Sequence, residues 1–109
     1  MKSPKISIIT VVYNAVDTIE ETVRSVVEQT YSNIEYVVVD GKSTDGTVAV
    51  LEQYQSHFAY YISESDKGLY DAMNKAMKQC TGDFCLFLNA GDVFYEATTI
   101  EQIVTEIDD

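Results

Sequence analysis

The chain has 109 residues, of which 46% are hydrophobic and 23% charged, a composition typical of one compact soluble domain. Eighteen acidic residues against seven lysines and arginines give a formal charge of −11, which would repel nucleic acid or an anionic membrane surface, so we expect neither partner. No stretch approaches the roughly 20 apolar residues of a membrane span, and no cleavage site follows the first apolar run, so the expected location is cytoplasmic.

The first predicted strand covers residues 6–12, an apolar and β-branched run that Tyr13 and Asn14 end. A helix should follow, because the segment from Asp17 to Glu20 has the spacing of a capping box. Apolar residues then recur at helical spacing and predict one stripe facing the sheet: Ile19, Val23, Val26 and Val27.

The second predicted strand covers residues 34–39 and stops at Asp40 and Gly41. Turn and N-cap residues at 43–47 predict that another helix begins near Val48. A short third strand is expected at residues 60–62, followed by a polar loop at 63–68.

The clearest helical pattern runs from residue 69 to residue 80, where apolar side chains recur at intervals of three and four. A fourth strand is predicted at 84–88, ending in the turn 89–92, and a last helix at 97–107. The runs 36–39 and 84–88 are continuously apolar, which predicts strands buried on both faces of a parallel sheet.

Regular alternation of strands and helices predicts an α/β fold. We expect a Rossmann-like open, mainly parallel sheet of about four strands in the order 3-2-1-4, with helices on both faces, formed by one domain over residues 1–109. The carboxyl ends of parallel strands meet at one rim, where ligands bind. The polar and aromatic residues expected at this rim are Tyr13, Asn14, Asp40, Lys42, Asp66, Lys67, Asn89 and Asp92.

Acids at such a rim would repel a phosphate unless a cation lay between them. Oxygen ligands such as the Asp92 carboxylate and the Asn89 carbonyl suit Mg²⁺ or Mn²⁺, which can hold a diphosphate through one or two carboxylates. Lys67 and Lys42 could add positive charge. The sequence therefore predicts a site for a divalent metal and a phosphorylated ligand.

Structural roles compete with these functional ones. Asp45 and Asp66 could serve only as helix caps, and Tyr13 could be a core side chain. Cys80 and Cys85 lack further ligands at metal spacing, so we expect two buried thiols. The chain has neither a G-x-G-x-x-G nor a P-loop motif, and it lacks the acids that a phospho-receiver domain needs after its first strand.

Four segments in order resemble the N-terminal half of family 2 glycosyltransferases with the GT-A fold. They cover nearly the whole chain: Ile6–Asn14, Val39–Thr47, Asp66–Ala76 and Thr81–Asp92. The resemblance implies a hexosyltransferase-type enzyme that moves a sugar, with inversion, from a UDP- or GDP-linked donor to an acceptor. It also implies a divalent metal, Mg²⁺ or Mn²⁺, on the donor diphosphate.

The same resemblance implies roles for individual residues. Tyr13 would lie against the nucleoside base and Asp40 would hydrogen-bond it. Asp66, Lys67 and Asp71 would lie near the ribose and the phosphates.

The turn 89–92 occupies the place of the family's D-x-D motif, but Asn89 and Gly91 stand where acids are usual. Metal binding would therefore depend on Asp92, with Asn89 beside the nucleotide. The L-N-A-G-D form resembles the branch that builds bacterial surface polysaccharides. That branch would supply a saccharide or lipid-linked acceptor, and peripheral attachment at the inner membrane is an alternative to a free cytoplasmic location.

In this family the acceptor-binding half and the acidic general base follow the D-x-D segment, and none of the remaining acids here is placed for that role. We therefore expect a donor-binding half, truncated before the acceptor-binding half and inactive alone, with its catalytic residue unknown. Two alternatives remain: a non-catalytic nucleotide- or metal-binding module, and a half-domain that forms a homo-oligomer through its open sheet edge.

Overall fold

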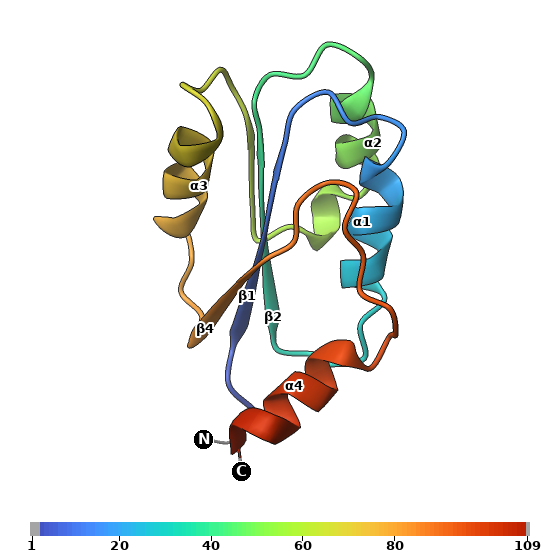
Figure 1. Ribbon diagram of the computed structural model, residues 1–109, viewed down its shortest axis with the longest axis vertical. Coiled ribbons are helices and arrows are strands. Elements are labelled where there is room, and N and C mark those ends of the chain that lie inside the picture. Colours follow the sequence, from blue (N-terminus) through green and yellow to red (C-terminus); the bar gives the residue numbers. More distant parts are fainter. Residues whose placement is uncertain (1–2, 109) are drawn as a thin grey trace.

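The computed structural model, which describes residues 3–108, contains one sheet of four parallel strands. The strands are β1 (Ile6–Val12), β2 (Ile34–Asp40), β3 (Tyr60–Ser63) and β4 (Phe84–Phe87). Their order is β3-β2-β1-β4, and every neighbouring pair is parallel (Figure 1). The predicted fold class and strand order are confirmed.

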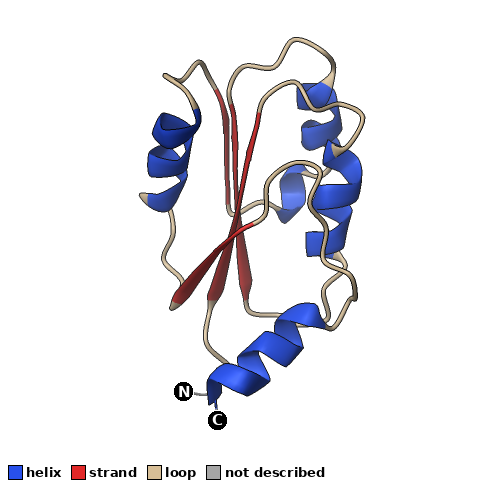
Figure 2. Ribbon diagram, viewed as in Figure 1, coloured by secondary structure: helices blue, strands red, loops and turns tan. Residues whose placement is uncertain are grey.

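Helices cover both faces of this sheet. They are α1 (Ile19–Val27), α2 (Thr47–Gln53), α3 (Leu69–Met77) and α4 (Thr99–Asp108), with a 3-10 turn η1 (Gln55–His57) after α2. Helices α1 and α2 lie on one face and α3 on the other, whereas α4 lies at the end where the strands begin (Figure 2). Within residues 3–108, no helix is long and apolar enough to cross a membrane.

Two apolar clusters pack on opposite faces of the sheet, because successive strand residues point to opposite sides. On β1, Ile6 and Ile8 join the cluster that faces α1 and α2, and Ile9 and Val11 join the one that faces α3. All seven residues of β1 are buried. The burial of every residue of β1 therefore follows from its central place in a covered sheet.

The start of α1 differs from the predicted capping box. The helix begins at Ile19, and the preceding Thr18 makes no side-chain cap bond. Instead the amides of Thr18 and Ile19 donate to the carbonyl of Ala15 at 3.1 and 2.9 Å. The backbone turn before the helix satisfies donors that the expected cap would have satisfied.

Strand β4 is more exposed than its sequence predicts. Phe84 and Phe87 are 36% and 38% exposed, and Cys85 is exposed while Cys80 is only partly buried. The expectations of a strand covered on both faces and of two buried thiols are therefore wrong. β4 pairs with β1 on one side, and no other strand among residues 3–108 pairs with its outer edge. Burial and the adjacent Cys85 thiol raise the pKa of Cys80 to about 11.

The chain entering β4, in contrast, is tightly fixed. The Glu35 carboxylate accepts hydrogen bonds from the amide and hydroxyl of Thr81, both at 2.7 Å, and from the Ser7 hydroxyl at 2.7 Å. Burial acts to raise the pKa of Glu35, but these bonds outweigh it and the pKa is lowered. A Cβ on Gly82 would lie 2.5 Å from Ser7 Oγ and 2.9 Å from the Lys5 carbonyl, so this turn has no room for a side chain.

Candidate functional site

An open cavity of about 490 Å³ lies at the carboxyl ends of the central strands, beside the start of α3. Its volume is within the range of ordinary small-molecule sites. The lining residues come from the end of β1 and the residue after it, the turn after β2, the segment before α3 and the start of α3: Val11, Val12, Tyr13, Gly41, Ser65, Asp66, Gly68, Leu69 and Ala72. Two of the sequence-predicted site residues, Tyr13 and Asp66, therefore lie together at this cavity.

Tyr13 is 64% exposed, so it is not the core side chain that the structural alternative proposed. Its ring stands at the cavity, next to Gly41. A Cβ on Gly41 would lie 3.4 Å from Tyr13 Cδ1 and 2.9 Å from Asp66 Oδ2. Because Gly41 has no side chain, both the Tyr13 ring and the Asp66 carboxylate can lie close to the backbone just after β2.

Asp40, the acid that ends β2, is fully buried. Its carboxylate accepts hydrogen bonds from the Ser43 amide at 2.9 Å, the Ser43 hydroxyl at 2.6 Å and the Ser63 hydroxyl at 2.7 Å. The Ser43 hydroxyl also accepts from the Asn14 amide at 2.7 Å. Asp40 thus fixes the turn after β2 and, through Ser43, the backbone of Asn14 next to Tyr13. The contact of Asp40 with a nucleobase stays a prediction.

Asp45 has the structural role that the sequence left open. Its carboxylate accepts from the hydroxyl and amide of Thr47 at 2.6 and 3.1 Å, and from the Val16 amide at 3.2 Å. The Thr47 hydroxyl is the main cause of the lowered pKa of Asp45. The residue thereby joins the start of α2 to the loop before α1, away from the lining of the cavity.

The segment from Glu64 to Gly68 forms one wall of the cavity and is held by the first turns of α3. Asp66 accepts from the Gly68 amide at 3.0 Å, and Asp71 accepts from the Lys67 amide at 2.9 Å. This backbone bond and, less strongly, nearby lysine charges lower the pKa of Asp71. Asp66 therefore both stabilises the turn before α3 and places a carboxylate at the cavity. The Asp71 carboxylate faces the segment 64–68, and the Lys67 side chain is exposed.

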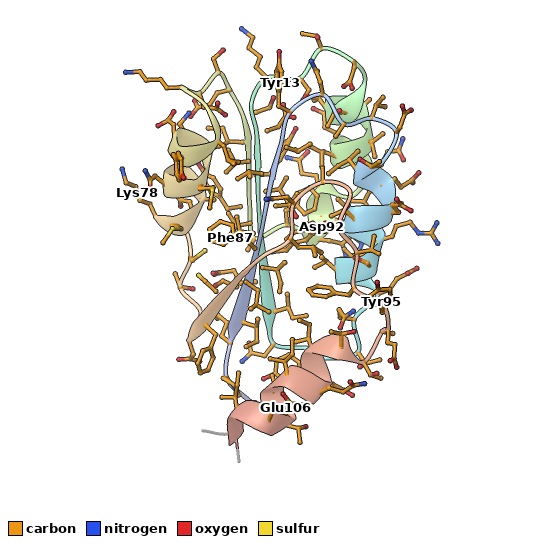
Figure 3. All side chains as sticks on the ribbon, viewed as in Figure 1. Tyr13, Lys78, Phe87, Asp92, Tyr95 and Glu106 are labelled. Carbon is orange, nitrogen blue, oxygen red and sulfur yellow. The ribbon has the colours of Figure 1, made fainter. Side chains whose placement is uncertain are left out.

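The turn 89–92 lies apart from this cavity. β4 pairs with β1 only as far as Ile9, three residues before β1 ends, so its end is about 10 Å further back along the sheet. The turn lies against α1, where the Gly91 amide donates a hydrogen bond to Thr22 Oγ1 at 3.0 Å. Figure 3 shows Tyr13 and Asp92 at different heights along the sheet. The single rim expected from the sequence is thus two separate groups of residues.

The oxygen atoms available to a metal at this turn are few. Asp92 is exposed, and the Asn89 side-chain oxygen is buried without a hydrogen-bond partner among residues 3–108. Within the described part of the chain, no group of three or more His, Cys, Asp or Glu residues is arranged to hold a metal ion. One carboxylate and one unpaired amide oxygen suit a cation that takes its other ligands from a diphosphate and water, and they do not form a complete protein cage.

The sequence also left three residues of the site unnoticed. Ser43 and Ser63 hold Asp40, and Lys75 lies against the segment before α3. For Lys75 a signal was present, because it follows Asp71 by four residues on the same helix. For the serines no spacing rule would have distinguished them from other loop residues.

The family model described as "Glycosyl transferase family 2" matches residues 7–109, and the chain belongs to this family. Among curated proteins, an uncharacterized glycosyltransferase of Mycobacterium tuberculosis is 41% identical over 103 residues, which are 94% of this chain and 39% of the relative. TuaG of Bacillus subtilis, named for teichuronic acid biosynthesis, is 40% identical over 82% of this chain and 36% of its own length. The chain thus spans about two fifths of these relatives.

Solved structures show the same fold. A mannosyltransferase from Pyrobaculum calidifontis, in complex with GDP-Man and Mn²⁺, has a TM-score of 0.86 at 28% identity, over 97% of this chain and 33% of that one. TarS from S. aureus, in complex with UDP-GlcNAc, has a TM-score of 0.86 at 30% identity, over 95% of this chain and 31% of that one. Both are glycosyltransferases of GT-A architecture, which confirms the fold and family expected from the motifs.

Proposed function

We propose that this chain is the donor-binding part of a glycosyltransferase and binds a UDP- or GDP-linked sugar. The observation that supports this most directly is the cavity at the strand ends, where an exposed tyrosine ring and the Asp66 carboxylate meet in a chain of this family. Complexes of two similar structures with GDP-Man and UDP-GlcNAc support the same class of ligand.

Each part of the cavity suits one part of such a donor. The Tyr13 ring offers a flat apolar face for a base, and the Asp66 carboxylate can accept from base N–H or ribose hydroxyl groups. Lys42 and Lys67 are exposed at the turns around the cavity and can offset the charge of the phosphates. The bound nucleoside would thereby be oriented before any reaction at the sugar.

We further propose that Asp92 and the Asn89 side-chain oxygen help to hold Mg²⁺ or Mn²⁺. The unpaired Asn89 oxygen and the exposed carboxylate fit an ion that is bound mainly through the donor diphosphate. When bound, the ion would neutralise negative charge on the departing nucleoside diphosphate. The Mn²⁺ in the mannosyltransferase complex supports this choice of metal.

For the whole protein, we propose inverting transfer of the sugar to a saccharide or lipid-linked acceptor in bacterial surface polysaccharide synthesis. The names of TuaG and of the mycobacterial PGL/p-HBAD biosynthesis glycosyltransferases support this class of product. Inversion needs a carboxylate that takes the acceptor proton during attack on the anomeric carbon. We assign that base to sequence outside these 109 residues, and turnover of a donor sugar by the chain alone would contradict the assignment.

Calorimetric titration of the chain with UDP and with GDP, each with and without Mn²⁺, tests donor binding. We expect heat for one nucleotide, and binding about tenfold weaker in Tyr13→Ala, because base stacking contributes about 1–3 kcal/mol. Tyr95→Ala is the matched control, since Tyr95 is 98% exposed and lies outside the cavity lining. The absence of heat in all four conditions would overturn the proposal.

The metal is tested with Asp92→Ala. This variant should bind the nucleotide without metal as the unmodified chain does, and should lose the gain in affinity that Mn²⁺ gives. An unchanged response to Mn²⁺ would place the metal elsewhere.

A further inference from the structure

The cavity wall formed by Glu64–Gly68 has few attachments. It leaves β3 with the Glu64 amide bonded to the Asp40 carbonyl at 2.9 Å, and it enters α3 through Gly68, whose φ is +113°. Between these points, Ser65 and Asp66 line the cavity. Whatever holds the middle of the segment therefore also sets the shape of the cavity.

Lys75, two turns into α3, supplies such an attachment. Its Nζ donates to the Ser65 carbonyl at 3.1 Å and lies 3.2 Å from Glu64 Oε1. It also lies 3.7 Å from Asp71 Oδ2, the carboxylate that accepts from the Lys67 amide. One ammonium group thus joins the first two residues of the segment to the helix that supports it.

The charges around Lys75 suit this role. Desolvation acts to lower its pKa, but the hydrogen bond and charge of Glu64, with the charges of Asp71 and Asp66, outweigh it and raise the pKa. Its side chain is only 28% exposed. Without this cation, Glu64 and Asp71 would each lose an ion-pair partner, which would leave more negative charge beside a cavity that has to accept an anionic diphosphate.

We propose that Lys75 is a positioning residue for the nucleotide, which it serves by holding the segment 64–68 in the shape that forms the cavity wall. This inference rests on the proposed donor binding. Lys75 is not among the cavity-lining residues, so its effect is transmitted through Ser65 and through the pair Asp71 and Lys67.

The test compares Lys75→Met, which keeps the apolar stem, with Lys75→Arg, which keeps the charge. Lys78→Met is the matched control, because Lys78 is an exposed lysine just after α3 that points away from the sheet and takes part in no ion pair within residues 3–108 (Figure 3). Binding of UDP and GDP is measured by calorimetry, and exchange of the Lys67 and Gly68 amides by NMR.

We expect Lys75→Met to weaken nucleotide binding about tenfold and to speed exchange at both amides, because a loosened wall misplaces the groups that contact the ligand. Lys75→Arg should restore binding to within about threefold, and Lys78→Met should behave as the unmodified chain. Equal binding by Lys75→Met and the unmodified chain would overturn the inference and leave the proposed function intact. A failure of the unmodified chain to bind either nucleotide would overturn both.

Discussion

The ends of β2 and β4 are alike in sequence and opposite in structure. In each case an acid follows an apolar run, as the last residue of β2 and in the turn after β4, yet Asp40 is fully buried and Asp92 is exposed. Asp40 accepts three hydrogen bonds, whereas no hydrogen bond to the Asp92 carboxylate is present within residues 3–108. The place of a strand in the sheet thus decides whether the acid at its end supports the fold or remains free for a ligand.

The cause lies in what surrounds each strand. β2 has β1 and β3 as neighbours and helices on both faces, so its terminal carboxylate enters a dry region where it must be paired. β4 has one strand neighbour and stops early, so its turn emerges over α1. The same substitution is therefore expected to cost much more stability at the buried acid than at the exposed one.

The largest expected effect on stability is at Asp40, the buried acid at the end of β2. Asp40→Asn replaces one acceptor oxygen by a donor that faces the serine hydroxyls, and should lower the free energy of unfolding by about 3 kcal/mol. Asp92→Asn should change it by less than about 0.5 kcal/mol, as is usual for surface positions. Urea denaturation measures the free energy of unfolding of both variants. Similar losses in the two variants would contradict the difference between the buried and the exposed acid.

The tight entry into β4 should be the next most sensitive point. Gly82→Ala places a Cβ against Ser7 Oγ and backbone atoms, so we expect a loss of about 2 kcal/mol in the free energy of unfolding. Gly91→Ala is not a neutral control because Gly91 has a φ of +98°. No loss of stability in Gly82→Ala would show that the neighbouring atoms can move to make room for the added Cβ.

A smaller, pH-dependent effect is expected at Glu35. Its pKa is lowered in the folded state, so the stability it adds is present above the ordinary value of 4.5 and is lost as the pH falls through the folded-state pKa. Glu35→Gln should be about 1–2 kcal/mol less stable than the unmodified chain at neutral pH. The difference should shrink in urea titrations as the pH falls through the folded-state pKa, because below it both side chains are uncharged. A constant difference would exclude the carboxylate charge as its source.

The smallest effect on stability is expected at the open edge. Phe87→Lys introduces a charge on β4, where the native ring is already 38% exposed, and should cost less than about 1 kcal/mol. Any concentration-dependent self-association through this edge should disappear, because an edge lysine opposes strand pairing. Sedimentation velocity measures this, with Lys78→Met as the control. Self-association that persists in Phe87→Lys would place the contact elsewhere.

The sequence predicted most of the fold because its apolar patterns are strong. Strand positions, helix positions and the order of the sheet agree with the structure to within a few residues. The exposure of β4 was not predictable. An apolar run shows that a strand can be buried, but it does not show whether other strands or helices lie against that strand. The exposed Cys85 follows from the same limit.

At the site, residue types were easier to predict than their arrangement. Tyr13 and Asp66 were expected at the rim and both line the cavity. The separation of Asp92 from them depends on the stagger of β4 against β1, which no local pattern encodes. The difference in burial between Asp40 and Asp92 could not be predicted, because the spacing of residues does not show that Ser43 and Ser63 come together around the Asp40 carboxylate.

The pairing of β1 with β4 also has a consequence for how the protein folds. The Thr10 hydroxyl at the centre of the sheet donates to the Leu88 carbonyl across 78 positions of the chain. During synthesis, β1 and β2 can pair early, but β1 stays an unprotected edge until residues 84–87 emerge. Contacts this distant slow folding and prolong the exposure of an apolar strand, so β1 is open to aggregation for as long as β4 has not yet been made.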